Sequence, residues 1–146
     1  MIAVDTNLLV YAHRADSEWH ASALRQLVRL AEGRSPWAIP WPCVHEFLAI
    51  VTHPQIYLPP STRESALASL TVWLDSSTCV PIGEGPGYMA VLARLLSAGR
   101  VVGGMIHDAR VAAICLHNGV SLLWTADRDF SRFTELKTLN PLVKKK

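Results

Sequence analysis

Along the chain, short apolar runs alternate with longer amphipathic stretches. The short runs are typical of strands and lie at residues 1–4 (MIAV), 37–39 (WAI), 79–82 (CVPI) and 120–124 (VSLLW). In the longer stretches apolar residues recur every three or four positions, which is the spacing of an amphipathic helix. These stretches cover residues 16–32, 43–53, 61–76, 85–99 and 105–119. Strands that alternate with helices predict an α/β sandwich with a mostly parallel sheet.

Local signals predict where several of these helices begin or end. Asp16 or Ser17 is expected to cap the first helix, because short polar side chains accept hydrogen bonds from the first free backbone N–H groups. Gly99 follows the fourth helix at a typical stop position. The chain has no repeat, linker or low-complexity segment. We therefore expect one domain over residues 1–143, followed by a flexible basic tail at 144–146.

Composition narrows the class of protein without choosing a function. Of the 146 residues, 50% are hydrophobic and 18% are charged, which is enough apolar material for a core without disulfide or metal support. The net charge of +2 neither requires nor excludes a nucleic acid partner. The three cysteines are far apart and lack C-x-x-C spacing, so we expect reduced thiols. A charge at Asp5 is unsuited to a secretory signal, and no apolar run reaches the roughly 18 residues of a membrane span. These features predict a cytoplasmic protein with no membrane partner.

Acidic residues follow two of the predicted strands. Asp5 ends the run at 1–4, and Asp127 and Asp129 come after the run at 120–124. In an open parallel sheet, ligands bind beyond the carboxyl ends of the strands. Two further acids, Glu46 and Asp108, interrupt otherwise apolar helical segments. We expect these five side chains to converge at one edge of the sheet.

Each acid also has an ordinary explanation. Asp5 could form an Asx turn, and Asp108 could be the N-cap of its helix. Asp127 and Asp129 could be turn residues, and Glu46 could reach the surface from a partly buried helix. Independent caps, however, need not project toward the same end of one sheet, which favours a common site.

Convergent carboxylates would require a cation. Two carboxylates about 5 Å apart repel by roughly 3 kcal/mol at an effective dielectric constant of about 20. Mg²⁺ or Mn²⁺ is the natural partner, because these hard ions prefer carboxylate oxygens. His45 and His107 stand beside Glu46 and Asp108, but adjacent helical residues point about 100° apart, so we expect the histidines not to be ligands. A divalent ion held by carboxylates is typical of phosphoryl hydrolysis or transfer.

Four segments together resemble the PIN-domain ribonucleases, and among them the VapC toxins of prokaryotic type II toxin–antitoxin systems. They are VDTNLLVYA (4–12), HEFLAIV (45–51), HDARVAAICLHNGV (107–120) and LLWTADRDFSRF (122–133). The resemblance spans nearly the whole chain. It implies a three-layer α/β/α sandwich, an endoribonuclease activity that depends on Mg²⁺ or Mn²⁺, a homodimer, and inhibition by a cognate antitoxin.

The resemblance also implies roles for individual residues. Asp5 and Asp108 correspond to direct metal ligands, and Glu46 and Asp127 to catalytic acids that act through water or at a second metal. Asp129 matches a position that is often acidic. The residues that would orient the acids are Thr6, Asn7 and Thr125.

Basic and aromatic residues near these motifs are candidates for contacts with RNA. The basic candidates are Arg14, Arg110 and Arg128. Trp37 and Trp41 could stack on bases or receive an antitoxin helix, although packing in the core or in a dimer is favoured.

Two other functions compete with a nuclease. A phosphatase of the haloacid-dehalogenase type also places an aspartate after its first strand, but it needs a second one two positions later, where this chain has Asn7. A non-catalytic PIN-like module that binds RNA or protein has no use for four repelling carboxylates. Both alternatives are less favoured than the nuclease.

Overall fold

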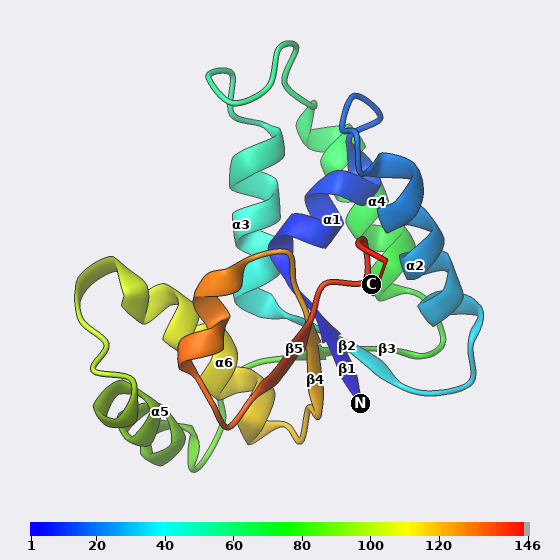
Figure 1. Ribbon diagram of the computed structural model, residues 1–146. Coiled ribbons are helices and arrows are strands. Elements are labelled where there is room, and N and C mark those ends of the chain that lie inside the picture. The colour runs from blue at the N-terminus through cyan, green and yellow to red at the C-terminus, as the bar shows by residue number, and fades with distance from the viewer. Residues whose placement is uncertain (145–146) are drawn as a thin grey trace.

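The computed structural model describes residues 1–144 and contains a central sheet. Within these residues the sheet has five strands in the order β3-β2-β1-β4-β5, and every neighbouring pair is parallel (Figure 1). The strands are β1 (Ile2–Val4), β2 (Trp37–Pro40), β3 (Cys79–Ile82), β4 (Leu122–Trp124) and β5 (Lys137–Leu139). The predicted α/β fold with a parallel sheet is confirmed.

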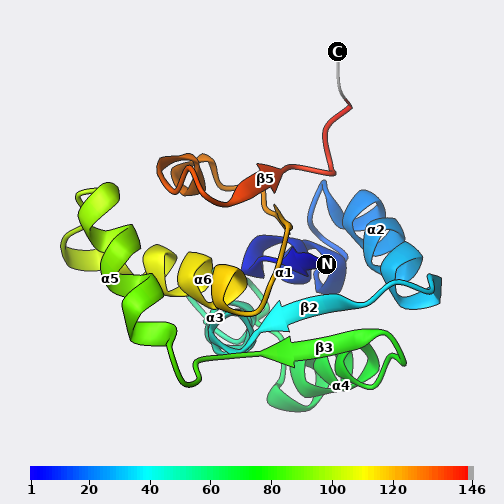
Figure 2. The same ribbon diagram turned by 90° about the horizontal axis from the view of Figure 1, so that it is seen from below.

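Helices lie on both sides of this sheet. Figure 2 shows α5 and α6 together on one side and α2 on the other, so the predicted three layers are present. The α-helices are α1 (Thr6–His13), α2 (His20–Glu32), α3 (Trp41–Val51), α4 (Arg63–Leu74), α5 (Tyr88–Ala98) and α6 (Ile106–His117). Two short 3₁₀ helices, η1 (Gly103–Met105) and η2 (Arg128–Arg132), precede α6 and follow β4.

The central strands are apolar because both faces of the sheet are covered. Ala3, Ala38 and Leu123 stand side by side in three adjacent strands and are fully buried. Strands covered on both faces lose the alternation of apolar and polar residues, which is why they appeared as continuous apolar runs. Trp37 is also fully buried and belongs to the core, whereas Trp41 remains 42% exposed.

The strand order places a crevice at the end of β1. From β1 the chain passes to β2 on one side, and β4 pairs with β1 on the other side. In α/β sheets the point where the order reverses is where ligands bind, because the connections leave the strand ends in opposite directions. The backbone N–H of Asp5 donates to the carbonyl of Trp124 at 2.9 Å, which holds the two strand ends together. The candidate acids therefore start from a fixed pair of strand ends.

One predicted helix boundary was wrong, and one strand was not predicted. The first amphipathic helix begins at His20 and not near Asp16, because the Asp16 carboxylate is bound by Arg14 at 2.6 Å. Ser17 accepts a hydrogen bond from the Trp19 N–H and forms a turn instead of a cap. Strand β5 was not predicted, because its short sequence KTL is half exposed at the edge of the sheet and has no apolar run.

Within the described part of the chain, no helix is both long and apolar enough to cross a membrane. Lys144 is exposed, and the other two residues of the predicted basic tail, 145 and 146, lie outside the described residues. The division into a domain at 1–143 and a tail stays a prediction.

Helix α4 offers a direct test of the capping pattern. The Thr62 Oγ1 atom accepts a hydrogen bond from the Ser65 N–H at 3.1 Å. Thr62→Ala removes this acceptor and should lower the free energy of unfolding by about 1 kcal/mol. Thr62→Ser keeps the hydroxyl and is the matched control. Equal urea midpoints for the alanine and serine variants would contradict the assignment of this cap.

Candidate active site

Asp5 occupies the junction between β1 and α1. Its side chain is the N-cap of α1, where Oδ1 accepts a hydrogen bond from the Thr6 N–H at 2.8 Å. Its other oxygen, Oδ2, accepts from the Thr125 hydroxyl at 2.7 Å. Asp5 is only 6% exposed, so these two bonds replace the water that the carboxylate has lost. The backbone donor is the next residue, Thr6, and not the residue two positions on that the alternative of an Asx turn requires.

Thr125 and Asn7 join Asp5 to the segment that follows β4. The Thr125 hydroxyl accepts from the Asp127 N–H at 3.0 Å and from the Asn7 side chain at 3.3 Å, besides donating to Asp5. The Asn7 Oδ1 atom accepts from the Ala126 N–H at 3.1 Å. A hydroxyl has one donor and two acceptor positions, so that of Thr125 is fully used. The polar residues flanking the two strands thus form one network around Asp5.

Three carboxylates lie beyond this network. One oxygen each from Asp108, Asp127 and Asp129 falls within 4.8 Å of the others. Asp127 and Asp129 come from the start of η2, where Asp127 Oδ1 accepts from the Asp129 N–H at 2.8 Å. Asp108 lies in the first turn of α6, and Met105 occupies the N-cap position. The alternative that Asp108 is the N-cap of its helix is therefore wrong.

Glu46 approaches the same region from α3. It is exposed, and its Oε2 atom accepts from the Thr6 hydroxyl at 3.3 Å. It lines a cleft of about 640 Å³ together with Asp108 of α6. Burial is the main cause of the raised pKa of Asp5 and Asp108, and the nearby charge of Glu46 adds to it in both cases. The five acids predicted from sequence all lie at the carboxyl end of the sheet.

Burial raises the pKa of two of these acids, Asp5 and Asp108. Burial raises the pKa of Asp5 to about 6, although the hydrogen bonds from Thr125 and Thr6 lower it. Asp108 is half-buried, and its pKa is raised first by burial and then by the charges of Asp127 and Asp129. Both carboxyls would hold their charge more readily beside a cation.

The triad of Asp108, Asp127 and Asp129 fits a divalent metal ion. It offers three carboxylate oxygens within a few ångströms, the ligand type that hard cations prefer. Asp5 and Glu46 lie outside this tightest group. Both Asp5 oxygens already accept hydrogen bonds, although those from Asn7 at 3.4 Å and from Cys43 at 3.6 Å are long and weak. A metal contact at Asp5 would have to replace one of these two.

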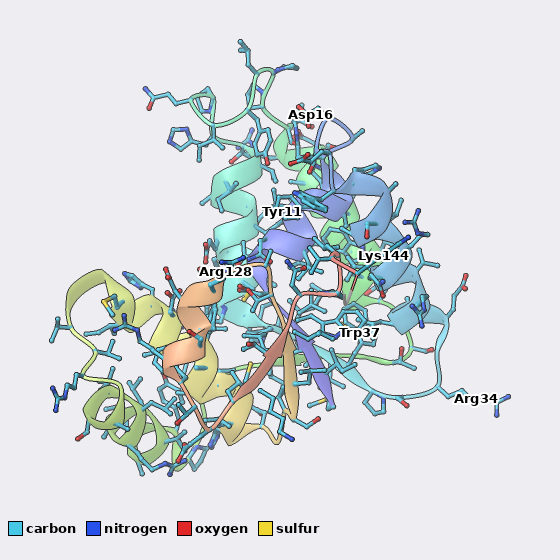
Figure 3. All side chains as sticks on the ribbon, in the orientation of Figure 1. Tyr11, Asp16, Arg34, Trp37, Arg128 and Lys144 are labelled. Atoms are coloured by element: carbon cyan, nitrogen blue, oxygen red, sulfur yellow. The ribbon has the colours of Figure 1, made fainter. Side chains whose placement is uncertain are left out.

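The three arginines singled out from sequence occupy different surroundings. Arg14 lies at the far end of α1, where it binds Asp16 and the Pro59 carbonyl and covers the Tyr57 ring. Its side chain is only 11% exposed and is not brought to the acids. Arg128 lies at the acidic end of the sheet and is exposed (Figure 3). Arg110 lines the cleft that contains Glu46 and Asp108.

Sequence reasoning missed two residues of the site. The buried thiol of Cys43 donates weakly to Asp5, and Glu84 forms an ion pair with Arg110. Neither has a local sequence signal: Cys43 appeared as an ordinary apolar position, and Glu84 lies in the glycine-rich loop GEGPG at 83–87. The pairing of Glu84 arises only when α6 folds beside this loop.

The pKa of Asp5 predicts how stability depends on pH. Well below pH 3.8 the carboxyl is protonated in both folded and unfolded protein, so it has no effect on stability. As the pH rises from 3.8 to about 6 the unfolded chain ionises first, and stability is lost. Above that range the full cost is present, about 3 kcal/mol at about 1.4 kcal/mol per pH unit.

Asp5→Asn should remove this dependence. In EDTA near pH 7, the variant should be more stable than the unchanged protein by up to about 3 kcal/mol, less the cost of its altered hydrogen bonds. Near pH 3, below the unfolded pKa of 3.8, the advantage should vanish. Urea unfolding at both pH values measures the difference, with Asp75→Asn as the control because Asp75 is exposed. Parallel pH profiles for the Asp5 variant and the unchanged protein would show that the buried carboxyl carries no such cost.

Comparisons with known proteins agree with this geometry. The family model of the PIN domain matches residues 2–136. The VapC ribonuclease Mb2897 of Mycobacterium bovis is 33% identical over 142 residues, which cover 97% of this chain and 96% of that protein.

Two solved structures share the fold. VapBC2 from Rickettsia felis, bound to a DNA fragment from its promoter, has a TM-score of 0.68 and 21% identity, and covers 95% of this chain and 98% of its own. VapC20 of Mycobacterium tuberculosis has a TM-score of 0.66 and 17% identity over 93% of this chain and 98% of its own. The chain belongs to the PIN-domain family and, within it, to the VapC ribonucleases.

Proposed function

We propose that this protein is the toxin of a type II toxin–antitoxin system and an endoribonuclease that hydrolyses RNA phosphodiester bonds with Mg²⁺ or Mn²⁺. The observation that carries the proposal is the approach of the Asp108, Asp127 and Asp129 oxygens to within 4.8 Å at the end of a PIN-domain sheet. Such a cluster is costly without a cation and useful with one. The curated relatives named as VapC ribonucleases support the same reaction.

The proposed catalytic set is Asp5, Glu46, Asp108 and Asp127. Asp108 and Asp127, helped by Asp129, would hold the ion, and Asp5 would join them by giving up a weak hydrogen bond. Mg²⁺ and Mn²⁺ are favoured because every available donor in the triad is a carboxylate oxygen. When bound, the ion would activate water and stabilise the charge that develops on the phosphoryl group.

The surrounding residues would position these acids. Thr125 donates to Asp5 and accepts from the Asp127 N–H, so its hydroxyl fixes both carboxylates at once. Asn7 fixes the backbone of the same segment through the Ala126 N–H. Glu46 is exposed in the cleft and is hydrogen-bonded on one side by Thr6, so its carboxylate is placed to accept a proton beside the substrate.

The competing enzyme function is less well supported. A phosphatase of the haloacid-dehalogenase type requires an acid at position 7, whereas Asn7 donates its amide to Asp5 and Thr125. A carboxylate at that position would repel Asp5 and lose both donated bonds. A non-catalytic binding module would gain nothing from the acidic triad.

The proposal includes a cognate antitoxin, RNA and a second copy of the chain as partners. Its support is family likeness: the related Rickettsia felis structure is a VapBC complex on promoter DNA, and a Neisseria gonorrhoeae neighbour is a FitA–FitB complex. Residues 1–143 would form the single nuclease domain of the complex.

Replacing either of two acids tests the catalytic site. Asp108→Asn and Asp5→Asn should each lower RNA cleavage in Mg²⁺ or Mn²⁺ by about a hundredfold or more, because each removes a charge from the acidic set. EDTA should stop turnover, and either ion should restore it. Asp75→Asn, at the exposed end of α4, is the control for a change of charge alone. Cleavage that persists in EDTA, or in both folded active-site variants, would disprove the metal site.

The partner proposal has its own test. A small protein encoded next to this gene should co-purify with the chain when the two are co-expressed, and it should suppress RNA cleavage. Light scattering of the chain alone should give the mass of two copies. A monomeric mass would contradict the dimer without affecting the nuclease.

A further inference from the structure

The cleft beside the acidic site contains one arginine among its lining residues. Arg110 lies on α6 two residues after Asp108, and both side chains line the space that α3 closes with His45 and Glu46. RNA that enters this cleft brings phosphates toward several carboxylates. A cation on the cleft wall is therefore needed to hold the chain of phosphates near the reacting bond.

In the structure Arg110 is paired with Glu84. The Nε–H of Arg110 donates to Glu84 Oε1, and the two side chains are 47% and 36% exposed. The pair raises the pKa of Arg110 and lowers that of Glu84 through the same hydrogen bond. Arg110 thus faces the cleft while its charge is offset by a carboxylate.

The loop that carries Glu84 is fixed to the same helix as Arg110. The Asn118 side chain, at the end of α6, donates to the Gly83 carbonyl at 3.0 Å. On the other side of the loop, the Tyr88 ring packs edge-on against His117 at 6.2 Å between ring centroids. Gly87 turns the chain between them with a φ of +89°, which favours glycine. Both partners of the ion pair are therefore carried by anchored backbone.

A phosphate group can compete with Glu84 for this arginine. Exposed ion pairs contribute little to stability, because water already solvates both charges. The bond to Glu84 uses one of the five N–H donors of a guanidinium, and phosphate can bind two at once. Arg14 differs, since its guanidinium donates to four acceptor atoms on three residues and its side chain is mostly buried.

We propose that Arg110 binds a phosphate of the RNA in this cleft, and that Glu84 occupies Arg110 until RNA displaces it. Glu84 then sets the affinity for RNA by competing with the substrate for one cation. This inference rests on the proposed ribonuclease function, because it assigns the residues that hold the same substrate.

The test measures RNA binding without cleavage. A short fluorescein-labelled single-stranded RNA is titrated with the full chain in EDTA at low salt, and fluorescence anisotropy gives the dissociation constant. Glu84→Gln should tighten binding by about threefold to tenfold, since it frees Arg110 for phosphate. Arg110→Gln should weaken binding and reduce its salt dependence. When Arg110 has already been replaced by Gln, adding Glu84→Gln should leave the dissociation constant for RNA unchanged.

A second exposed ion pair supplies the matched control. Arg94 donates from Nε to Glu135 Oε1 at 3.0 Å and from Nη2 to Glu135 Oε2 at 3.0 Å, with a longer contact from Nε to Oε2 at 3.1 Å, and neither residue lines the cleft. Glu135→Gln changes the net charge by the same amount as Glu84→Gln. If it tightens RNA binding equally, or if Glu84→Gln still acts in the absence of Arg110, the inference is overturned.

Cleavage assays separate this inference from the proposed function. With Mg²⁺ or Mn²⁺, Glu84→Gln should lower the KM for RNA and leave kcat nearly unchanged. A chain that binds RNA with the expected pattern but never cleaves it would retain the inference and lose the nuclease. If the chain cleaves RNA but Glu84→Gln has the same affinity and KM as Glu135→Gln, the nuclease function is retained and the inference about Glu84 is lost.

Discussion

The burial of the Asp5 carboxylate between the ends of β1 and β4 is the constraint on which the rest of the site depends. A buried carboxylate must keep its hydrogen bonds, and Asp5 obtains them from the N-terminus of α1 and from the Thr125 hydroxyl. Both donors are backbone-anchored at the two central strands. The strand order that pairs β1 with β4 therefore also decides where this charge can be held.

The other acids are arranged outward from Asp5. Thr125 connects Asp5 to the backbone of Asp127, and Asp127 in turn accepts from the Asp129 N–H. Exposure increases along this line, from the buried Asp5 to the exposed Asp129. Different surroundings therefore stabilise the different carboxylates. Fixed hydrogen bonds stabilise the innermost one, Asp5, and water or a cation stabilises the outer ones.

Much of this arrangement could be predicted from the sequence, because its causes are local. The apolar runs that precede Asp5 and Asp127 predict strands that end in polar turns. In a parallel sheet the carboxyl ends of these strands lie at the same edge. The helical positions of Glu46 and Asp108 followed from apolar spacing. The order of the acids in space did not follow: Asp129, ranked last from sequence, lies in the tightest group, while Asp5 lies behind it. That order depends on how η2 turns after β4.

Contacts between distant segments were beyond prediction for the same reason. Helix α2 lacks the cap expected from Asp16, whose carboxylate is bound by Arg14. Strand β5 pairs with β4 at the edge of the sheet. Glu84 had no signal at all, since its partner Arg110 follows 26 residues later.

The pairing of Glu84 with Arg110 also follows from the electrostatics of the site. A site with five carboxylates attracts cations and repels RNA, although the chain as a whole has a net charge of only +2. An arginine at the cleft would reduce that repulsion, but beside Asp108 it could also bind the acidic residues themselves and occupy the metal position. In the structure Arg110 donates to Glu84 instead, a residue outside the triad. The acids then remain available to a metal ion, and the arginine to a phosphate.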